Sequence, residues 1–280
     1  MAERPETLRF DDLTPYLLLQ NGNYLYKIPF RGGWAVLKVY YGSRSWFSRI
    51  VKSLENVLLA GQTSYMPKTR LRIESECLDV WREHGFRVFE TYPDIQVVAP
   101  NCPEGGYMLF EYVDAVKLDA FLRDESKPVQ ERFDLYVDWL KEWSRRHDIA
   151  IREREPRLVH ENGDGKHVML TGDGFLWFDF EMIYRGRKNV HHHVSHEIVQ
   201  YIWFLMRNTP EAIRSRLIAE TVSGYPDKRR LVGAYDYFWR HPNPFHRLGR
   251  AAERALKAKA RRPDSKYSVA RMLKENLDAM

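Results

Sequence analysis

The chain has 280 residues, of which 44% are hydrophobic and 14% aromatic, enough to bury a full core and unlike a disordered segment. Apolar runs such as residues 201–206 fall far short of the roughly 20 residues that cross a bilayer, and the first thirty residues lack a signal-peptide pattern. The cysteines, Cys77 and Cys102, are too few for a disulfide framework and lack metal-site spacing. We therefore expect a cytoplasmic protein.

The formal net charge of +6 and the isoelectric point near 9.2 indicate an anionic partner. Nucleic acid, an acidic membrane surface and a phosphorylated substrate all fit this charge. Much of the excess lies in residues 245–262, where basic residues crowd a predicted helix; the alternative is a solvated basic face, which is common on terminal helices. Because the sequence has no recognisable nucleic-acid-binding motif, nucleic acid is the least favoured partner.

The first third of the chain is strand-like. Short runs rich in aromatic and branched residues are separated by the hairpin turn signals Asn-Gly-Asn at residues 21–23 and Gly-Gly at residues 32–33. Apolar residues recur at helical spacing over residues 69–84, and Gly85 is placed to end this helix. The expected strands lie at residues 16–19, 24–29, 34–40, 95–98 and 107–113.

The rest of the chain is mostly helical. After Pro128, apolar residues recur at steps of three or four up to His147, which predicts an amphipathic helix. A polar loop then precedes two short strands, residues 167–170 and 175–178. Further helices are expected at residues 193–207, 210–222, 228–240, 246–260 and 266–279. Together these elements predict an α+β fold.

Lys38 is the first candidate site residue, because it lies in an otherwise apolar strand, Trp-Ala-Val-Leu-Lys-Val at residues 34–39. A lysine in a strand interior is unfavourable unless it is paired, so it requires an acidic partner. Glu74 in the following helix can supply the carboxylate, and Glu76 is the nearby competitor. The alternative for Lys38 is an edge lysine whose ammonium reaches solvent.

Two polar segments follow in the helical part. Residues 160–167 read His-Glu-Asn-Gly-Asp-Gly-Lys-His, a glycine-containing loop between the amphipathic helix and the strand pair. Asp179 comes directly after the second strand, in the segment Phe-Asp-Phe-Glu at residues 178–181. A carboxylate at the end of a buried strand suits an Mg²⁺ ion that bridges phosphates. The alternative for Asp179 is a helix N-cap.

The order and spacing of these elements over residues 16–206 resemble the protein-kinase-like superfamily. Within it, the chain resembles lipopolysaccharide-core sugar (Kdo and heptose) kinases and aminoglycoside phosphotransferase-like small-molecule kinases. The resemblance implies a two-lobed fold, with a five-stranded antiparallel small lobe and one main helix over residues 1–113 and a mainly helical large lobe over residues 114–280. It also implies ATP, Mg²⁺ and transfer of the γ-phosphate to a sugar hydroxyl.

The resemblance assigns roles to the residues that bind the nucleotide. Lys38 would grip the α- and β-phosphates, Glu74 would orient Lys38, and Asp179 would carry Mg²⁺. Backbone groups near Glu111 and Val113, in the connection between the lobes, would bind adenine. The turn at residues 20–23 occupies the place of the phosphate-covering loop.

The loop at residues 160–167 departs from the family pattern at its two catalytic positions. Asn162 stands where the family has the aspartate that accepts the hydroxyl proton, and His167 stands where it has the asparagine that helps hold a second Mg²⁺. Asp164 is the candidate substitute base, with Glu161 second; the alternative for Asp164 is a turn former. His160 would brace the loop. A pseudokinase or nucleotide-binding module is therefore the alternative function.

Residues 44–59 form part of an insertion at residues 41–66 that bears on the acceptor. Aromatic and aliphatic residues recur there at near-helical spacing beside Arg44, Arg49 and Lys52. Such a segment can lie at an anionic membrane surface, which would suit a glycolipid acceptor and a peripheral position on the inner face of the cell membrane. The alternative is a helix packed on the small lobe.

Four histidines, His191, His192, His193 and His196, suggest a metal site. Their adjacency points the rings to different sides, so that only His192 and His196 share a helix face. The favoured alternative is a structural role, because a loop that enters a helix commonly carries polar rings.

Overall fold

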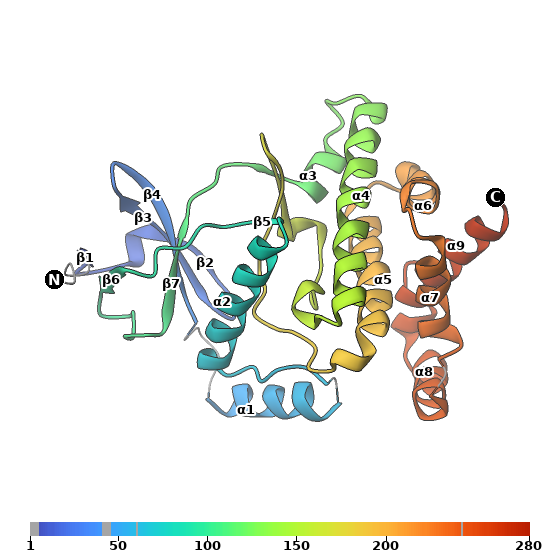
Figure 1. Cartoon of the computed structure of the whole chain (residues 1–280), viewed down its shortest axis with the longest axis horizontal. Helices are drawn as coiled ribbons and strands as arrows, with labels where there is room; N and C mark the ends of the chain where they lie inside the picture. The colour runs from blue at the N-terminus through green and yellow to red at the C-terminus, as the bar shows by residue number, and fades with distance from the viewer. Residues whose placement is uncertain (1–5, 41–45, 60, 242) are drawn as a thin grey trace. The chain divides into compact units, whose positions relative to one another are not determined.

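The computed structural model describes residues 6–40, 46–59, 61–241 and 243–280 (Figure 1). Contacts divide the chain into two compact units. Residues 1–115 and 176–185 form the first unit, and residues 116–175 and 186–280 form the second. Most strands lie in the first unit and most helices in the second, which confirms the α+β class.

The first unit is built on a four-stranded antiparallel sheet in the order β2-β3-β4-β7. A two-residue turn joins β3 to β4, and both of its residues, Arg31 and Gly32, have positive φ, as a hairpin twist requires. Alternate residues of β4 face a common apolar core, whereas Lys38 points to the opposite face of the sheet. The strands are β2 (Leu17–Gln20), β3 (Tyr24–Phe30), β4 (Gly33–Val39) and β7 (Tyr107–Glu111).

The expected five-stranded antiparallel small lobe is not confirmed. Strand β6 (Ile95–Val98) forms, but it pairs in parallel with β1 (Glu6–Arg9), outside the four-stranded sheet. The hydroxyl of Tyr107 hydrogen-bonds the backbone N–H of Val97 at 2.6 Å, so a side chain joins β6 to β7. The sequence pattern identifies β6 as a strand but does not select its partner, and the polar residues of β1 give no strand signal.

Helix α2 (Pro67–Glu83) lies in the first unit and ends as predicted. Gly85 has a φ of +71°, and the N–H groups of Gly85 and Phe86 bond the carbonyls of Arg82 and Trp81. The rings of Trp81 and Phe86 meet edge to face at 5.7 Å, which completes a Schellman motif. The unit also contains α1 (Trp46–Leu54), a π-helical turn (Glu55–Leu59) and β5 (Arg87–Val88), which pairs with Leu176 and Trp177 of β10 (Gly174–Trp177).

The second unit packs helices around α4 (Val129–Glu153), beside which α5 (Val190–Asn208) runs (Figure 1). Buried aromatic rings from these two helices fill the centre: Trp139 stacks on Trp143, and Tyr201 packs against both at steeper angles. The other elements are α3 (Leu118–Arg123), β8 (Val116–Lys117), β9 (Val168–Thr171), α6 (Glu211–Gly224), α7 (Lys228–Trp239), α8 (Pro244–Leu256) and α9 (Lys266–Asp278).

The helices of the second unit agree closely with the expected ranges. Helix α8 ends at Leu256, four residues before the expected end, and a 3₁₀ turn, Ala258–Arg261, follows it. Helix α4 continues six residues past His147, and the short helix α3 was not expected. In the described part of the chain, no helix has the length and apolar character needed to cross a membrane.

The αL conformation at Gly85 generates a stability prediction. We expect Gly85→Ala to lower the free energy of unfolding by about 1 kcal/mol, because an L residue is strained at positive φ although the space around Gly85 is open. Gly249→Ala in α8 is the matched control, since its surroundings are also open and its φ is helical. This substitution should be neutral or stabilising. Urea unfolding of both variants tests the contrast, and equal effects would contradict it.

Candidate functional site

Lys38 of β4 is almost completely buried, with 8% of its side chain exposed, and its ammonium group contacts three carboxylates. Its Nζ lies 2.7 Å from Oε2 of Glu74 and 2.7 Å from Oε1 of Glu181, and 3.4 Å from Oδ1 of Asp179. The hydroxyl of Tyr40 donates to the same Glu74 oxygen at 2.6 Å. The lysine is therefore paired, and α2 contributes the most buried of its partners.

Glu181 is a second centre of contacts. Arg70 of α2 donates through Nε to Oε2 of Glu181 at 2.8 Å, and the amide of Asn23 donates to Oε1. Arg70 also donates to the side-chain oxygen of Asn23 and, at 3.4 Å, to the carbonyl of Gly22. The turn between β2 and β3 is thus tied to the segment that follows β10.

Gly22 has a steric role in the same turn. A Cβ atom at this position would lie 2.5 Å from the hydroxyl of Tyr65, and the Arg70 guanidinium stacks over the Tyr65 ring at 4.5 Å. The one glycine of the turn therefore allows the backbone to approach an aromatic ring.

Asp179 has a φ of +75°, in the left-handed region that non-glycine residues rarely adopt. Such strain is stored where the surroundings fix it, and it is frequent at functional sites. Its side chain is 32% exposed, unlike those of Glu74 and Glu181. Of the three carboxylates around Lys38, that of Asp179 is the most accessible to a ligand.

The electrostatics follow from one ammonium group shared among three carboxylates. Burial would lower the pKa of Lys38, but Glu181, Glu74 and Asp179 outweigh it and raise that pKa above its usual value. Burial raises the pKa of Glu74, which the lysine only partly offsets. With Arg70 included, the cluster holds three acids and two bases, so it has one more carboxylate than cations, which favours an additional bound cation.

Other predicted residues of the first unit lie elsewhere. Glu76 pairs with Arg72 on the exposed side of α2, 2.5 Å away, and does not contact Lys38. The backbone N–H of Glu111 donates to the carbonyl of Glu90 at 3.0 Å, and its carboxylate accepts from the Glu90 N–H. Val113 follows β7 outside any strand and is partly exposed. Of the two proposed adenine-binding positions, Val113 has the less constrained backbone.

The loop at residues 160–167 lies in the second unit and is fixed to α5. Glu197 of α5 accepts the backbone N–H of His160 at 3.0 Å, and Gln200 donates to the carbonyl of Glu161 at 3.0 Å. The Tyr201 hydroxyl shares a 2.7 Å hydrogen bond with Nδ1 of His160. Three consecutive contacts along one helix face therefore set the path of the loop, and His160 is one of the braced residues.

Glu197 is completely buried and is held by residues of α4. It accepts from Nε1 of Trp143 at 2.9 Å and from the guanidinium of Arg146, and Nε2 of His147 lies 3.4 Å away. Burial would raise the pKa of Glu197, but chiefly Arg146 lowers it, to about 2. Burial lowers the pKa of His147 to about 4. The loop is thus anchored on a carboxylate that stays ionised.

Within the loop, the side chain of Asn162 is exposed. Asp164 is 2% exposed, accepts the Lys166 N–H at 3.2 Å and lies 3.4 Å from Nζ of Lys166, so it forms the N-cap of a 3₁₀ turn. Glu161 is partly exposed. His167 donates through Nδ1 to the carbonyl of Asn162 at 3.1 Å, which places the lone pair on Nε2, as in many metal-ligating histidines.

The histidines of α5 pack mainly against other rings. His192 lies between the rings of His191 and His241, with centroids 4.0 and 4.9 Å away, and His196 stacks on Phe238. Burial lowers the pKa of His192 to about 4. Within the described ranges no three His, Cys, Asp or Glu side chains are grouped so as to hold a metal ion. These contacts fit the structural interpretation.

Sequence reasoning missed Glu181, Arg70 and Asn23 as members of the Lys38 site and Glu197 as the anchor of the loop. Glu181 lies within the predicted metal segment at residues 179–181. The sequence therefore placed it near the site but did not predict its contacts with Lys38, Arg70 and Asn23. The sequence signal for Glu197 was an acidic residue directly before the largely apolar run that forms the rest of α5.

Comparisons with known proteins give limited information. No protein-family model matches the chain. No curated protein matches it. Among solved structures, the Rio2 kinase–ADP/Mg²⁺–phosphoaspartate complex from Chaetomium thermophilum is similar with a TM-score of 0.37 and 13% identity, over 94% of this chain and 70% of that chain.

The carboxylate cluster predicts how the first unit responds to loss of its cation. We expect Lys38→Met to lower the free energy of unfolding by about 3 kcal/mol or more at pH 7, because it leaves three carboxylates around one guanidinium. Burial already raises the pKa of Glu74, and the variant lacks the ammonium that partly offsets this, so Glu74 binds a proton more readily in the folded state and the deficit should shrink as the pH falls toward 5. Denaturant unfolding across this pH range, with Arg72→Met as the exposed control, measures it. A pH-independent deficit would contradict the prediction.

The contact between the loop and α5 predicts a steric effect. A Cβ atom on Gly163 would lie 2.1 Å from Cε2 of the buried Tyr201 ring, so Gly163→Ala should destabilise the second unit by about 1–3 kcal/mol. Gly172→Ala, in the turn between β9 and β10, meets nothing within 4 Å and is the control. The melting temperatures of both variants measure the difference. If Gly172→Ala lowers the melting temperature as much as Gly163→Ala does, the steric explanation is wrong.

Proposed function

We propose that the first unit binds ATP and that the chain is an ATP-dependent phosphotransferase. The observation that carries this proposal is the buried Lys38 ammonium, which pairs with Glu74 and is bordered by the accessible Asp179. Tyr40 holds the Glu74 carboxylate in turn. A fixed cation beside an accessible carboxylate provides the two elements that a nucleotide–metal complex requires.

Nucleotide binding requires Lys38 to exchange one of its contacts. Glu74 is nearly inaccessible and is bonded by Tyr40, so we assign the exchange to Glu181. Arg70 and Asn23 hold Glu181 and would stabilise its carboxylate after Lys38 turns toward a phosphate. Val113 would supply the backbone contact to adenine.

Mg²⁺ fits the donor set of this site. Magnesium commonly uses one or two carboxylates together with substrate phosphates and water, and Asp179 is an exposed carboxylate next to the phosphate-binding lysine. His167 is proposed as a second metal contact, since its Nδ1 donates to a carbonyl. When bound, Mg²⁺ would neutralise the phosphate charge.

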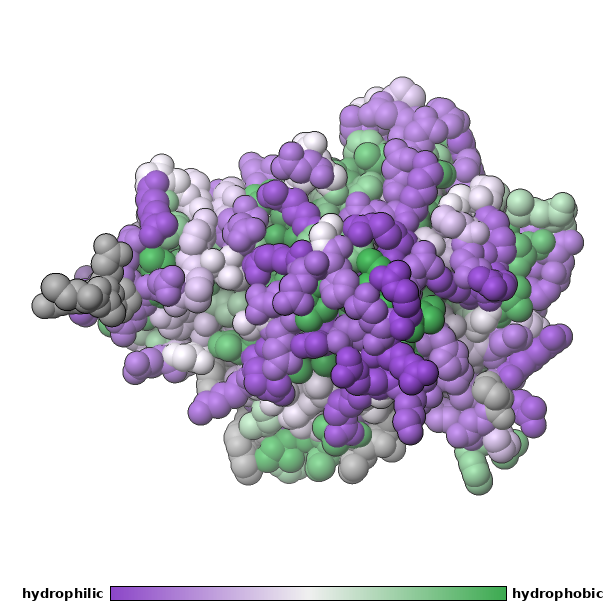
Figure 2. Space-filling view, viewed as in Figure 1, coloured by the Kyte–Doolittle hydropathy of each residue, from purple (hydrophilic) through white to green (hydrophobic). Residues whose placement is uncertain are grey.

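The proposed acceptor is a hydroxyl of a lipopolysaccharide-core sugar, a related glycolipid or a small molecule. Asn162 would position this hydroxyl, because phosphoryl transfer depends more on positioning than on proton abstraction. In α1, Phe47, Val51 and Leu54 are exposed, and Figure 2 shows this apolar surface in green at the lower edge of the view. This favours the membrane-surface interpretation of residues 44–59, of which Arg44 lies outside the described residues.

One observation favours the alternative function, a nucleotide-binding module without catalysis. Asp164, the candidate substitute base, is buried and occupied as the cap of a 3₁₀ turn. A carboxylate engaged in this way cannot accept a proton from a hydroxyl unless the turn opens. Glu161 then remains as the candidate base in the loop.

Binding and turnover separate the two functions. We expect ATP with Mg²⁺ to raise the melting temperature of the protein, and Asp179→Ala and Lys38→Met to abolish this shift, whereas Glu76→Gln should leave it unchanged. No shift in the unmodified protein would refute the proposal. Transfer of the γ-phosphate from labelled ATP to Kdo- or heptose-containing acceptors supports the phosphotransferase. Metal-dependent binding without transfer, and a gain of transfer in Asn162→Asp, would support the binding module instead.

A further inference from the structure

Helix α8 presents its sides in an unusual way. Its polar side faces helix α7 of the same unit. The Arg250 guanidinium lies over the Tyr237 ring at 4.3 Å, and the Arg254 guanidinium lies over the Trp239 ring at 4.4 Å. Glu253 accepts a hydrogen bond from the hydroxyl of Tyr267 at 2.6 Å. An amphipathic helix on a globular domain normally turns its apolar side inward, and α8 does the opposite.

The apolar residues of α8 consequently face solvent. The exposed fractions of Phe245, Leu248 and Leu256 are 82%, 67% and 82%. Their spacing, together with Ala252 between them, places them on one face of the helix. None of the described residues of α8 is buried. We call these three large side chains the α8 ridge.

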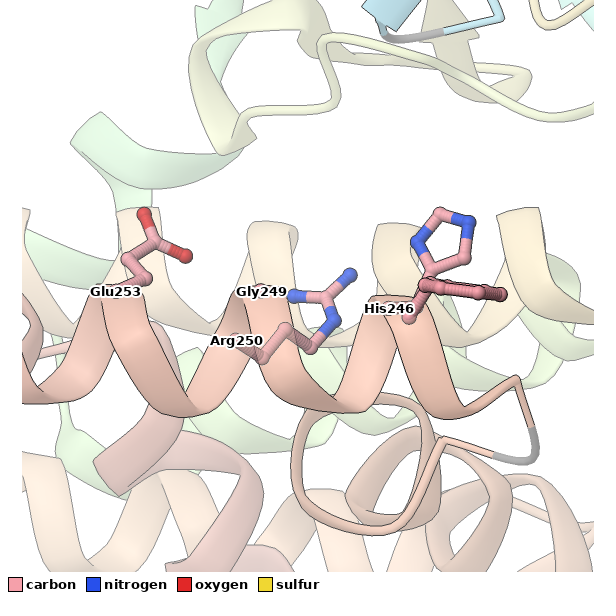
Figure 3. A pocket seen from close by; sticks show the side chains of 5 residues that line it. His246, Gly249, Arg250 and Glu253 are labelled. Atoms are coloured by element: carbon pink, nitrogen blue, oxygen red, sulfur yellow. The ribbon is translucent and has the colours of Figure 1, made fainter.

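The polar side of α8 borders the ridge at Phe245. Figure 3 shows His246 and Glu253 projecting to one side of the helix, where they line an open recess of about 380 Å³ with Phe245, Gly249 and Arg250. Leu248 and Leu256 do not line this recess and stand exposed beside it.

Charge identifies the kind of partner that fits this surface. Residues 245–262 contain seven basic residues and a single acid, so they account for the whole formal net charge of +6, while acids and bases balance in the rest of the chain. Arg250 and Arg254 are turned inward. The exposed basic residues that follow the ridge along the chain are Lys257, Lys259, Arg261 and Arg262, whereas Arg247 lies on the opposite side of the helix from the ridge.

We propose that α8 binds the surface of an anionic lipid bilayer, with the α8 ridge among the acyl chains and the exposed basic residues on the headgroup phosphates. An exposed apolar ridge followed along the chain by lysine and arginine is a pattern of interfacial helices. A second copy of the chain fits poorly, because a symmetric contact would bring two strongly basic segments together. A nucleic acid would use the charge but leave the ridge exposed. This inference does not depend on the phosphotransferase proposal.

The test measures cosedimentation of the full-length protein with vesicles of phosphatidylcholine containing phosphatidylglycerol, and with phosphatidylcholine alone. We expect binding to the anionic vesicles, weakened by salt. Combined Phe245→Ser, Leu248→Ser and Leu256→Ser substitutions should weaken it at least about tenfold. Combined Lys259→Gln, Arg261→Gln and Arg262→Gln substitutions should also weaken it. All six side chains are exposed, so the fold should persist, as circular dichroism can verify.

Controls separate this site from other surfaces. Met280→Ser removes an equally exposed apolar side chain, and Lys141→Gln removes an exposed charge on α4; both should bind as the unmodified protein does. Phe47→Ser tests α1 by itself. The inference is overturned if the unmodified protein does not bind vesicles, or if the ridge variant binds as well as it does. Loss of binding only in Phe47→Ser would assign the contact to α1, and a ridge-dependent dimer without vesicle binding would assign the ridge to a second copy.

Discussion

The burial of one ammonium group, that of Lys38, constrains the rest of the first unit. An unpaired charge in such a position would cost several kcal/mol, so its carboxylate partners must be in place when the unit is folded. The partners come from α2 and from the segment after β10, which are distant in sequence from β4. Pairing Lys38 therefore joins sheet, helix and returning segment, and the turn at Asn23 is included through Arg70 and Glu181. The candidate phosphate site is the place where these segments meet.

The second unit also depends on a buried, paired charge, but there the charge is negative. There the buried charge is the carboxylate of Glu197, which Arg146 and Trp143 satisfy from α4. Its remaining oxygen accepts the backbone N–H of His160, so the loop at residues 160–167 begins at a point fixed by the core. Because Gly163 has no side chain, the loop backbone can lie directly against the ring of Tyr201. The loop is therefore fixed to α5 at its start and along its path, which leaves Asn162 as one of its exposed side chains.

Local signals in the sequence predicted local structure well, because the forces that decide a cap or an isolated charge act over a few residues. Gly85 ended α2, and the apolar surroundings of Lys38 required an acid that Glu74 supplied. The partners of strands and side chains were harder to predict. The pairing of β6 with β1, and the contacts of Glu181 with Arg70, join residues about 90 and 111 positions apart, and no local pattern selects one distant partner over another. Fold class and the first pair of site residues were therefore within reach of the sequence, whereas the complete site was not.

Helix α8 shows the same distinction most clearly. Its sequence predicts an amphipathic helix with a basic face, and the usual assumption turns that face toward water. In the structure the arginine side of α8 faces the rest of the second unit. Cation–π contacts of Arg250 and Arg254 with its aromatic rings favour this orientation, and the methylene groups of each arginine also cover apolar surface. The cost is the exposure of Phe245, Leu248 and Leu256. That exposure is unfavourable in water but is relieved at a lipid surface, so the orientation that appears wrong for an isolated domain is the one that suits a domain at an anionic bilayer.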